Sequence, residues 1–214
     1  MRLCAVFLCV FTLAVGVIVA APAAETEKLR NDRVAVYEGA MQPGATVTVD
    51  RNVASVTVYS QGGTVEVAIE GEKPTKTAVK RGDVVFRPAK RQVLRNAGST
   101  EVRFVRVEFL GSGTPKAAPW GAEGLSPNYR VLVENQYARV YNIAIPAGTD
   151  EPQHSHKDWV VVCLMGSQIM HLMPDGRREP SSLKTGETAW RRGGTHIGQN
   201  LGKTNFWAIA VEPK

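Results

Sequence analysis

One feature constrains the fold of this chain more than any other, an internal repeat with a constant offset of 104 residues. Matches at this offset extend over roughly 80 residues without a gap, and a fixed period of this kind indicates duplicated structural units. The matching pairs include Gly44 and Gly148, Gly62 and Gly166, Gly82 and Gly186, and Asn96 and Asn200. The sequence therefore predicts two copies of one small domain, joined in tandem.

Each copy has the composition of short β-strands. Runs rich in Val, Ile, Thr and aromatic residues alternate with Gly, Pro and Asp, as at 53–59 and 64–69 in the first copy and at 159–165 and 206–211 in the second. The segment Pro174-Asp175-Gly176 is typical of a hairpin turn. No window has a sustained helical period. Many short strands at regular spacing indicate sandwiches or barrels, so we predict an all-β protein.

The N-terminus has the features of an export signal. Met1 and Arg2 form a short positive head, residues 3–20 are almost wholly apolar, and Ala21-Pro22-Ala23 offers the small residues that a signal peptidase reads. We predict a signal peptide over residues 1–23 and a periplasmic or secreted protein. An uncleaved anchor is the alternative, because the apolar run is long enough to span a bilayer. No later segment predicts a span, so no membrane span is expected after cleavage.

The rest of the chain divides at a Gly- and Pro-rich linker over residues 111–127. We place the first barrel at 31–110 and the second at 128–214. Cys163 is the only cysteine after the signal, so no internal disulfide is expected and an apolar core must stabilise the fold.

The second copy carries three histidines in a metal-binding pattern. Side chains alternate along a strand, so His154 and His156 point to the same face. His196 follows about forty residues later, behind Gly193 and Gly194. Three imidazoles on the inner face of a small barrel are suited to a divalent cation with open coordination positions.

These residues resemble the two motifs of the cupin superfamily. The first motif matches Gly148, His154, His156 and Gly166, and the second matches Gly186, Gly193, His196 and Asn200. The resemblance implies two double-stranded β-helix (jelly-roll) barrels and a metal site formed by His154, His156 and His196. One residue departs from the motif, because the glutamate ligand of the family falls at about Trp159.

Several neighbours are candidates for the same site. Asp158 is a fourth ligand, a hydrogen-bond partner of a ligand imidazole, or a plain turn residue. Trp159, Cys163, Trp190 and Arg191 are candidate pocket residues, with ordinary packing or solvation as the alternative. Imidazole ligands do not distinguish among iron, zinc, manganese, nickel and copper. Three neutral ligands leave the charge of the ion uncancelled, which favours a small anionic ligand.

The first copy lacks these imidazoles. The positions 104 residues before His154, His156 and His196 hold Asp50, Asn52 and Gln92. We interpret this barrel as degenerate, with a role in supporting the second barrel or in a homodimer contact. It also carries many of the basic residues behind the net charge of +6. No nucleic-acid-binding motif accompanies them, so we expect a solvated basic surface and no nucleic-acid partner.

Two classes of function remain. The sequence has no Ser-His-Asp order, phosphate loop or dinucleotide fingerprint, so a reaction would have to use the metal. The cupin resemblance implies a three-histidine, dioxygenase-like metalloenzyme acting on a small anionic substrate. The alternative is a non-catalytic protein of the cell envelope that binds a metal or a small ligand.

Overall fold

A computed structural model describes residues 23–50, 52–111 and 126–214. All of the predicted signal peptide except Ala23, and most of the predicted linker, lie outside these ranges. The described residues form 18 β-strands and no helix, which confirms the predicted all-β class. Consequently no helix in this part of the chain is long and apolar enough to cross a membrane.

The first copy contributes nine strands, β1 (Ala24–Arg30), β2 (Val34–Met41), β3 (Thr46–Val49), β4 (Ser55–Gln61), β5 (Gly63–Ile69), β6 (Thr75–Val79), β7 (Val84–Arg87), β8 (Gln92–Asn96) and β9 (Val102–Phe109). The second copy contributes β10 (Tyr129–Glu134), β11 (Ala138–Ile145), β12 (His154–His156), β13 (Trp159–Met165), β14 (Ile169–Leu172), β15 (Arg178–Pro180), β16 (Thr188–Arg191), β17 (Gly194–Asn200) and β18 (Phe206–Pro213).

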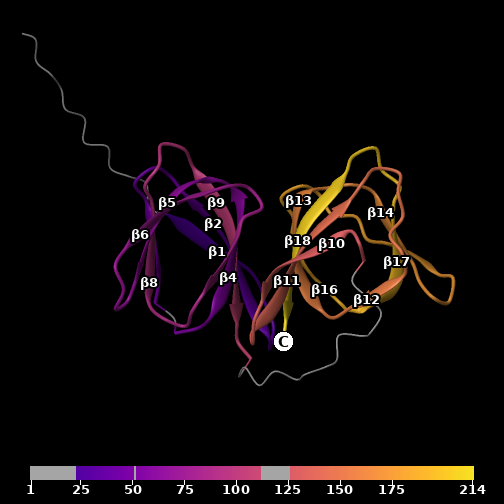
Figure 1. The fold of residues 1–214 in the computed structure, drawn as a ribbon, viewed down its shortest axis with the longest axis horizontal. Helices are drawn as coiled ribbons and strands as arrows, with labels where there is room; N and C mark the ends of the chain where they lie inside the picture. The colour runs from indigo at the N-terminus through magenta and orange to yellow at the C-terminus, as the bar shows by residue number, and fades with distance from the viewer. Residues whose placement is uncertain (1–22, 51, 112–125) are drawn as a thin grey trace, which may run out of the picture.

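Each copy folds into a barrel made of two facing antiparallel sheets. The strand orders are β1-β2-β9-β4-β7 and β3-β8-β5-β6 in the first copy, and β10-β11-β18-β13-β16 and β12-β17-β14-β15 in the second. The two sets match strand for strand, as the repeat predicts. Figure 1 shows the barrels side by side, the first in indigo to magenta and the second in orange to yellow.

Strand β1 lies before the predicted start of the first barrel at residue 31. It pairs along β2 from Ala24↔Ala40 to Arg30↔Ala35, so the first barrel begins about a strand earlier than the sequence suggested. The segment Ala24–Arg30 alternates poorly and is mostly exposed, because it forms the edge of its sheet. An edge strand of charged residues has no apolar period by which it could be recognised.

Three apolar clusters form the core of the molecule. One fills the first barrel around Tyr59 and Phe104, and another fills the second barrel around Tyr141 and Ile143. The third lies between the barrels, where outward-facing residues of both five-stranded sheets meet. It contains Val34, Val36, Val56, Val58, Val105 and Val107 of the first barrel and Val140, Val160, Val162, Leu164, Ile209 and Val211 of the second.

The edges of this interface have an approximate two-fold symmetry. Arg33 of the first barrel lies over the ring of Trp190 in the second, 5.9 Å from its centroid. Tyr137 of the second barrel, 104 residues after Arg33, stacks on Phe86 of the first, with ring centroids 5.7 Å apart. Phe86 is in turn 104 residues before Trp190. The repeat therefore relates the contacts across the interface as well as the strands.

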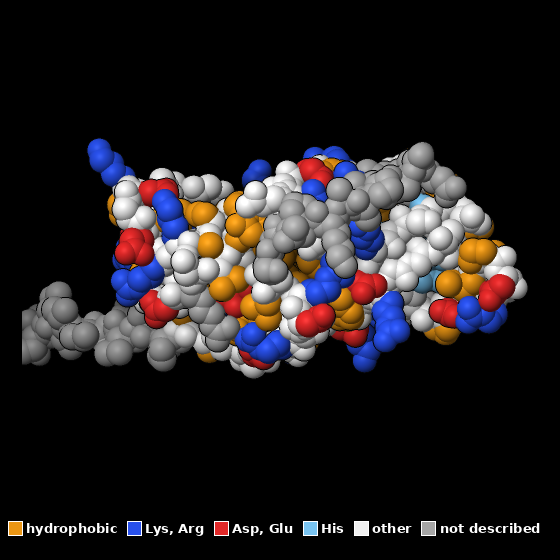
Figure 2. All heavy atoms as spheres, turned by 90° about the horizontal axis from the view of Figure 1, so that it is seen from below, with side chains coloured by type: hydrophobic (Ala, Val, Ile, Leu, Met, Phe, Trp, Pro, Cys, Tyr) orange, Lys and Arg blue, Asp and Glu red, His pale blue; other side chains and the backbone are white. Residues whose placement is uncertain are grey.

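The basic residues of the first copy do not gather into a surface of one sign. Four exposed pairs combine Lys90 with Glu72, Arg91 with Asp50, Arg95 with Glu66, and Arg103 with Glu101. Figure 2 shows blue and red side chains interspersed over the face that it presents. In the same view only small areas of imidazole reach the surface, and they lie on the second barrel.

Candidate metal centre

The three predicted histidines come together on two paired strands. β12 and β17 place His154 directly opposite His196, and His156 opposite Gly194. The ring centroids lie 4.8 Å apart for His154 and His196, 5.0 Å for His156 and His196, and 6.1 Å for His154 and His156. His154 and His196 are only 2% and 4% exposed. The alternation of the strand thus puts three imidazoles in one buried cluster.

Hydrogen bonds to carbonyl oxygens orient two of these rings. Nδ1 of His154 lies 2.9 Å from the Pro152 carbonyl oxygen, and Nδ1 of His156 lies 2.8 Å from that of Lys157. A carbonyl only accepts, so each Nδ1 carries the proton and each Nε2 has its lone pair free to accept or to coordinate. Nε2 of His156 is buried and has no hydrogen-bond partner. A buried lone pair without a partner is an unusual cost, and a metal ligand has this arrangement.

Burial also keeps the cluster uncharged. It lowers the pKa of His156 to about 4 and, together with the neighbouring histidines, lowers the pKa of His196 to about 2. The pKa of His154 is lowered by burial as well. Metal coordination requires neutral imidazole, so no proton has to leave these rings at neutral pH.

Tyr129 and Trp159 contact two of the histidine rings, and a bound ion would compete with the hydrogen bond from Tyr129. In the described part of the chain, no three His, Cys, Asp or Glu side chains are already arranged to enclose a metal ion. The Tyr129 hydroxyl lies 3.0 Å from Nε2 of His154, which is the lone pair that would coordinate. His156 stacks flat on Trp159, with ring centroids 3.5 Å apart and an interplanar angle of 11°. The donor set fits a metal, and Tyr129 and Trp159 are the groups that hold two of its rings.

A fourth histidine, which lies outside both motifs, belongs to the cluster. His171 on β14 stacks on His196, with ring centroids 3.7 Å apart and an interplanar angle of 9°. It lies opposite Gly198 on β17, two residues beyond His196. The available signal was strand alternation, because Ile169 faces the barrel interior and the second residue after it must do the same.

Glu151 is a second residue that the motifs did not reveal. It is 3% exposed, and its Oε2 lies 4.0 Å from Nε2 of His154. The Ser126 hydroxyl donates a hydrogen bond of 3.2 Å to Oε1 of Glu151, and burial raises the pKa of the Glu151 carboxyl to about 8. The carboxyl rests against Gly198, where a Cβ atom would come within 2.3 Å of Oε2. The cupin motif has its glutamate after the histidine pair, whereas Glu151 comes before His154, so the motif did not predict it.

Three of the predicted neighbours make their main contacts outside the cluster. Asp158 accepts a hydrogen bond of 2.7 Å from the backbone N–H of Gly193 and lies 3.8 Å from Arg33, so its carboxylate fixes a turn. Cys163 is fully buried in the apolar interior, where burial raises its pKa to about 11. Trp190 packs on the cluster between the barrels, because it pairs with the outward-facing Val160.

The other two predicted pocket residues, Trp159 and Arg191, line a cavity of about 270 Å³ inside the second barrel. His156, His171 and His196 form part of its polar lining. The apolar lining comes from Ile143, Ile145, Val161, Ile169, Leu183 and Phe206. Nε of Arg191 is buried without a hydrogen-bond partner. The cavity therefore combines neutral imidazoles, a guanidinium group and an apolar floor.

The fold of this chain is similar to that of several solved structures. A cupin 2 conserved barrel domain protein from Leptotrichia buccalis superposes with a TM-score of 0.59 at 14% identity, over 91% of this chain and 90% of that one. AerE from Microcystis aeruginosa gives 0.61 at 11% identity, over 92% and 95%. Oxalate decarboxylase OxdC from Bacillus subtilis gives 0.60 at 14% identity, over 89% and 72%. The chain has a two-barrel cupin fold.

This result confirms the predicted cupin resemblance at the level of the fold. No protein-family model matches the sequence, and no curated protein matches it. At 11% to 14% identity the likeness concerns architecture alone, so the function of the cupin barrels has to be argued from their own residues.

The first cupin barrel differs from the second by one residue of register at the histidine pair. Gln92 pairs with Val49, as His196 pairs with His154, so the structural counterpart of His154 is Val49 and not Asp50. The extra residue of the second barrel lies between the Asp150↔Gln199 bridge and His154, in the segment that contains Pro152. Proline has no N–H to donate, which favours a local break in the pairing.

Proposed function

We propose that the second cupin barrel binds a divalent metal ion through His154, His156 and His196 and holds a small anionic ligand beside it. One observation carries the proposal most directly, the buried and unpartnered Nε2 of His156 among two other neutral imidazoles. Its chemistry is that of a nitrogen ligand for a borderline cation. A bound ion would supply Lewis-acid chemistry and lower the pKa of a coordinated water.

Comparison with a structural neighbour supports a metal in general. Bacillus subtilis oxalate decarboxylase, one solved structure of which superposes with a TM-score of 0.59 at 14% identity, has Mn(II) centres. That finding concerns the neighbour. For the present chain the donor set is compatible with iron, zinc, manganese, nickel or copper, since all of them accept imidazole ligands.

The cavity supports a small anionic ligand. Its volume of about 270 Å³ suits a molecule of a few heavy atoms, and Arg191 lies in its lining with Nε free of any hydrogen bond. A guanidinium group pairs well with a carboxylate because its N–H groups match both oxygens. The apolar floor of Ile143 and Phe206 would keep water from competing for that pair.

Two roles follow from such a site. We favour a dioxygenase-like enzyme of the periplasm or the extracellular space, in which the ion and Arg191 hold the substrate together. A non-catalytic metal or small-ligand binder of the cell envelope is the second candidate. The Tyr129–His154 hydrogen bond favours the small-ligand form of this candidate, because it gives the Nε2 lone pair of His154 a partner other than a metal. Oxygen consumption by the iron-loaded protein with a panel of small acids would support the enzyme, whereas tight metal binding without turnover would support the binder.

The metal site is tested by removing one imidazole. His156→Ala should lose at least about nine tenths of the metal bound by the wild type, because three ligands are reduced to two. His171→Phe is the matched control, since it keeps a ring on His196 and removes no proposed ligand. Elemental analysis after loading with each ion measures the outcome. Wild-type metal content in His156→Ala, or equal losses in both variants, would contradict the assignment.

A further inference from the structure

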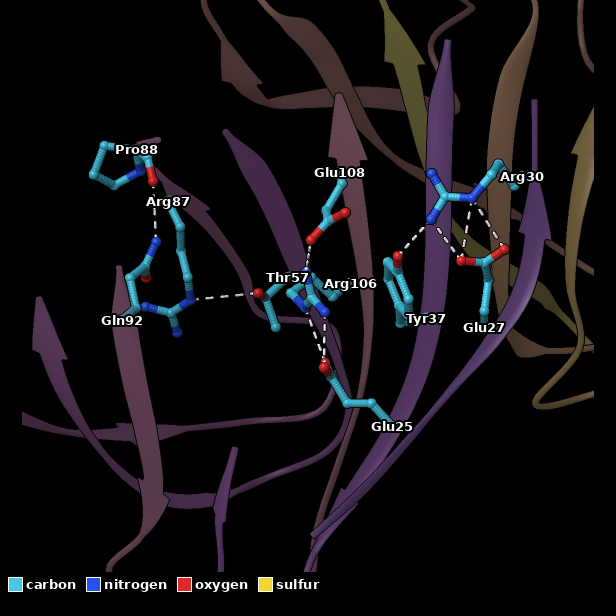
Figure 3. A network of polar contacts seen from close by, with 10 residues as sticks. All are labelled: Glu25, Glu27, Arg30, Tyr37, Thr57, Arg87, Pro88, Gln92, Arg106 and Glu108. Carbon is cyan, nitrogen blue, oxygen red and sulfur yellow. Dashed lines mark hydrogen bonds and ion pairs between the residues drawn. The ribbon is translucent and has the colours of Figure 1, made fainter. Parts of the chain in front are cut away.

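Polar side chains bind one another in the interior of the first cupin barrel. Arg87 donates to the Thr57 hydroxyl over 3.4 Å, and Arg106 forms ion pairs with both Glu25 and Glu108, as Figure 3 shows. The interior of this barrel therefore differs in chemistry from the histidine cluster of the second. A hollow with room for a ligand lies on the outer face of its five-stranded sheet, at the interface between the barrels.

The approximate two-fold symmetry of this interface is broken at Trp207. The indole of Trp207 packs on the first barrel, where a Cβ at Gly82 would lie 2.4 Å from the ring and the guanidinium carbon of Arg81 lies 5.3 Å from its centroid. The indole N–H donates to Oδ1 of Asn142 over 2.8 Å. Arg103 stands 104 residues before Trp207, so the residue at the symmetric position has no aromatic ring.

A hollow of about 420 Å³ lies at this symmetric position, and Arg103 lines it. The residues that the repeat relates to the neighbours of Trp207 line it as well, namely Glu38 in place of Asn142, Thr185 in place of Arg81, and Gly186 in place of Gly82. An added Cβ at Gly186 meets nothing within 4 Å, whereas one at Gly82 meets the indole. The hollow therefore has the surroundings of an indole site without the indole.

The walls of the hollow offer an apolar surface, an acceptor and two cations. Val162 and Leu164 belong to the apolar cluster between the barrels and also line the hollow. Glu38 stands where Asn142 accepts the indole N–H in the other half, and a carboxylate is the stronger acceptor. Arg81 and Arg103 line it too, and guanidinium groups are attracted to the faces of aromatic rings.

Two exposed ion pairs lie at the rim of the hollow. Lys28 lies 3.2 Å from Oε2 of Glu38, and Glu101 pairs with Arg103. Exposed pairs of this kind contribute little to stability, so they allow Glu38 and Arg103 to turn toward a ligand.

We propose that this hollow binds a planar, bicyclic aromatic compound with a ring N–H, of the indole type. The ring lies over Gly186, as the ring of Trp207 lies over Gly82. The ring N–H donates to the Glu38 carboxylate, and the guanidinium group of Arg103 covers the ring from the solvent side. The site is independent of the proposed metal centre, because no ligand of that centre takes part.

Indole is a suitable probe, and isothermal titration calorimetry measures how many molecules bind per chain and how tightly. Arg103→Trp places a ring in the hollow, so the number of indole molecules bound per chain should fall by one. Arg95→Trp is the matched control, because Arg95 is also an exposed, ion-paired arginine of the first barrel and does not line the hollow. This control should bind indole as the wild type does.

A second probe and a second variant test the role of Glu38. The compound 1-methylindole has the same ring without the N–H, and it should bind the wild type about tenfold more weakly than indole. In Glu38→Ala indole should also bind about tenfold more weakly, and the two probes should then bind equally.

The site is overturned if the wild type does not bind indole, if Arg103→Trp binds as many molecules as the wild type, or if Arg95→Trp loses as many as Arg103→Trp. Equal affinities of indole and 1-methylindole for the wild type would overturn the N–H contact with Glu38. A chain that binds indole but no metal would support this site and contradict the proposed metal centre, so the two proposals fail separately.

Discussion

Glu212 is a fully buried carboxyl whose ionisation the fold opposes. The Tyr141 hydroxyl and the backbone N–H of Lys157 donate to its two oxygens over 2.9 and 3.0 Å. Burial outweighs these bonds and raises the pKa from 4.5 to about 6. Because the folded-state pKa exceeds the unfolded one, Glu212 contributes its full stability below about pH 4.5 and loses it as the pH rises through 6.

Glu212→Gln should remove this part of the pH dependence. The free energy of unfolding of the wild type, minus that of the variant, should fall by about 2 kcal/mol between pH 4 and pH 7, since one pKa unit corresponds to about 1.4 kcal/mol. Urea denaturation at a series of pH values measures both proteins. A difference that stays constant over this range would show that Glu212 titrates as it does in the unfolded chain.

The sequence predicted the site residues whose position follows from local spacing along a strand. It did not predict the residues whose position depends on how the barrel folds. His154, His156 and His196 come from local spacing together with the second motif. His171 reaches the cluster from another strand, β14, and no spacing rule says which distant residue lies opposite. Glu151 lies three residues before His154, outside β12, so strand alternation does not predict where its side chain points. Alternation also gives the face of a strand but not the depth along the barrel. Cys163 therefore points inward, as expected, yet lies in the apolar core beyond the cavity lining.

Strand β17 offers a test of how tightly Glu151 is held. The Glu151 N–H donates to the Gly198 carbonyl oxygen over 2.7 Å, and the carboxyl lies where a Cβ of residue 198 would be. Gly198→Ala should destabilise the protein by about 1–3 kcal/mol, because the buried carboxyl has to move in a packed interior.

Gly194→Ala is the matched control for this change. It lies on the same strand, and an added Cβ there meets nothing within 4 Å, so its stability should stay within about 0.5 kcal/mol of the wild type. Thermal and urea denaturation compare the two variants. Equal stabilities would mean that Glu151 moves aside freely and does not form a fixed part of the cavity.

At the level of strands, the sequence predicted the elements with apolar faces and missed the exposed ones. β4 and β13 were evident as runs of Val and aromatic residues. β1 and β15 carry mostly exposed polar residues, so they lack the period that identifies a strand. The register of β12 was misassigned by one residue relative to β3, because a constant offset cannot reveal an insertion that a later deletion cancels.

The interface between the barrels can be tested with a pair of glycines related by the repeat. Gly82 and Gly186 both have positive φ, at 88° and 86°, so alanine strains the backbone similarly at the two positions. A Cβ at Gly82 would lie 2.4 Å from the Trp207 ring of the other barrel, whereas one at Gly186 meets nothing within 4 Å.

Gly82→Ala should therefore be less stable than Gly186→Ala by about 1–3 kcal/mol, which isolates the clash across the interface from the strain. The two free energies of unfolding, measured by urea denaturation under identical conditions, give this difference directly. Equal losses in both variants would indicate that the contact between Gly82 and Trp207 adjusts without cost.

The tandem architecture was predictable from the repeat, but the way in which the two barrels pack was not. A period identifies copies and says nothing of which faces meet. The sequence contains one indication of the packing, because residues 160–164 are apolar at every position and such a run suits a strand that is buried on both faces. Val160 and Val162 face the other barrel, and Trp159 and Val161 face the interior.

The apolar cluster between the barrels also has a bearing on ancestry. A polypeptide made of one copy alone would expose a broad Val-rich sheet to water, and the cheapest way to cover it is a second molecule placed around a dyad. The reciprocal Arg33–Trp190 and Tyr137–Phe86 contacts retain the form of such a dyad. Duplication and fusion of a subunit that associated with itself would leave contacts of this form. Within one chain each half can change its interior separately, and here all four histidines of the chain belong to the second half, whereas the first half has none.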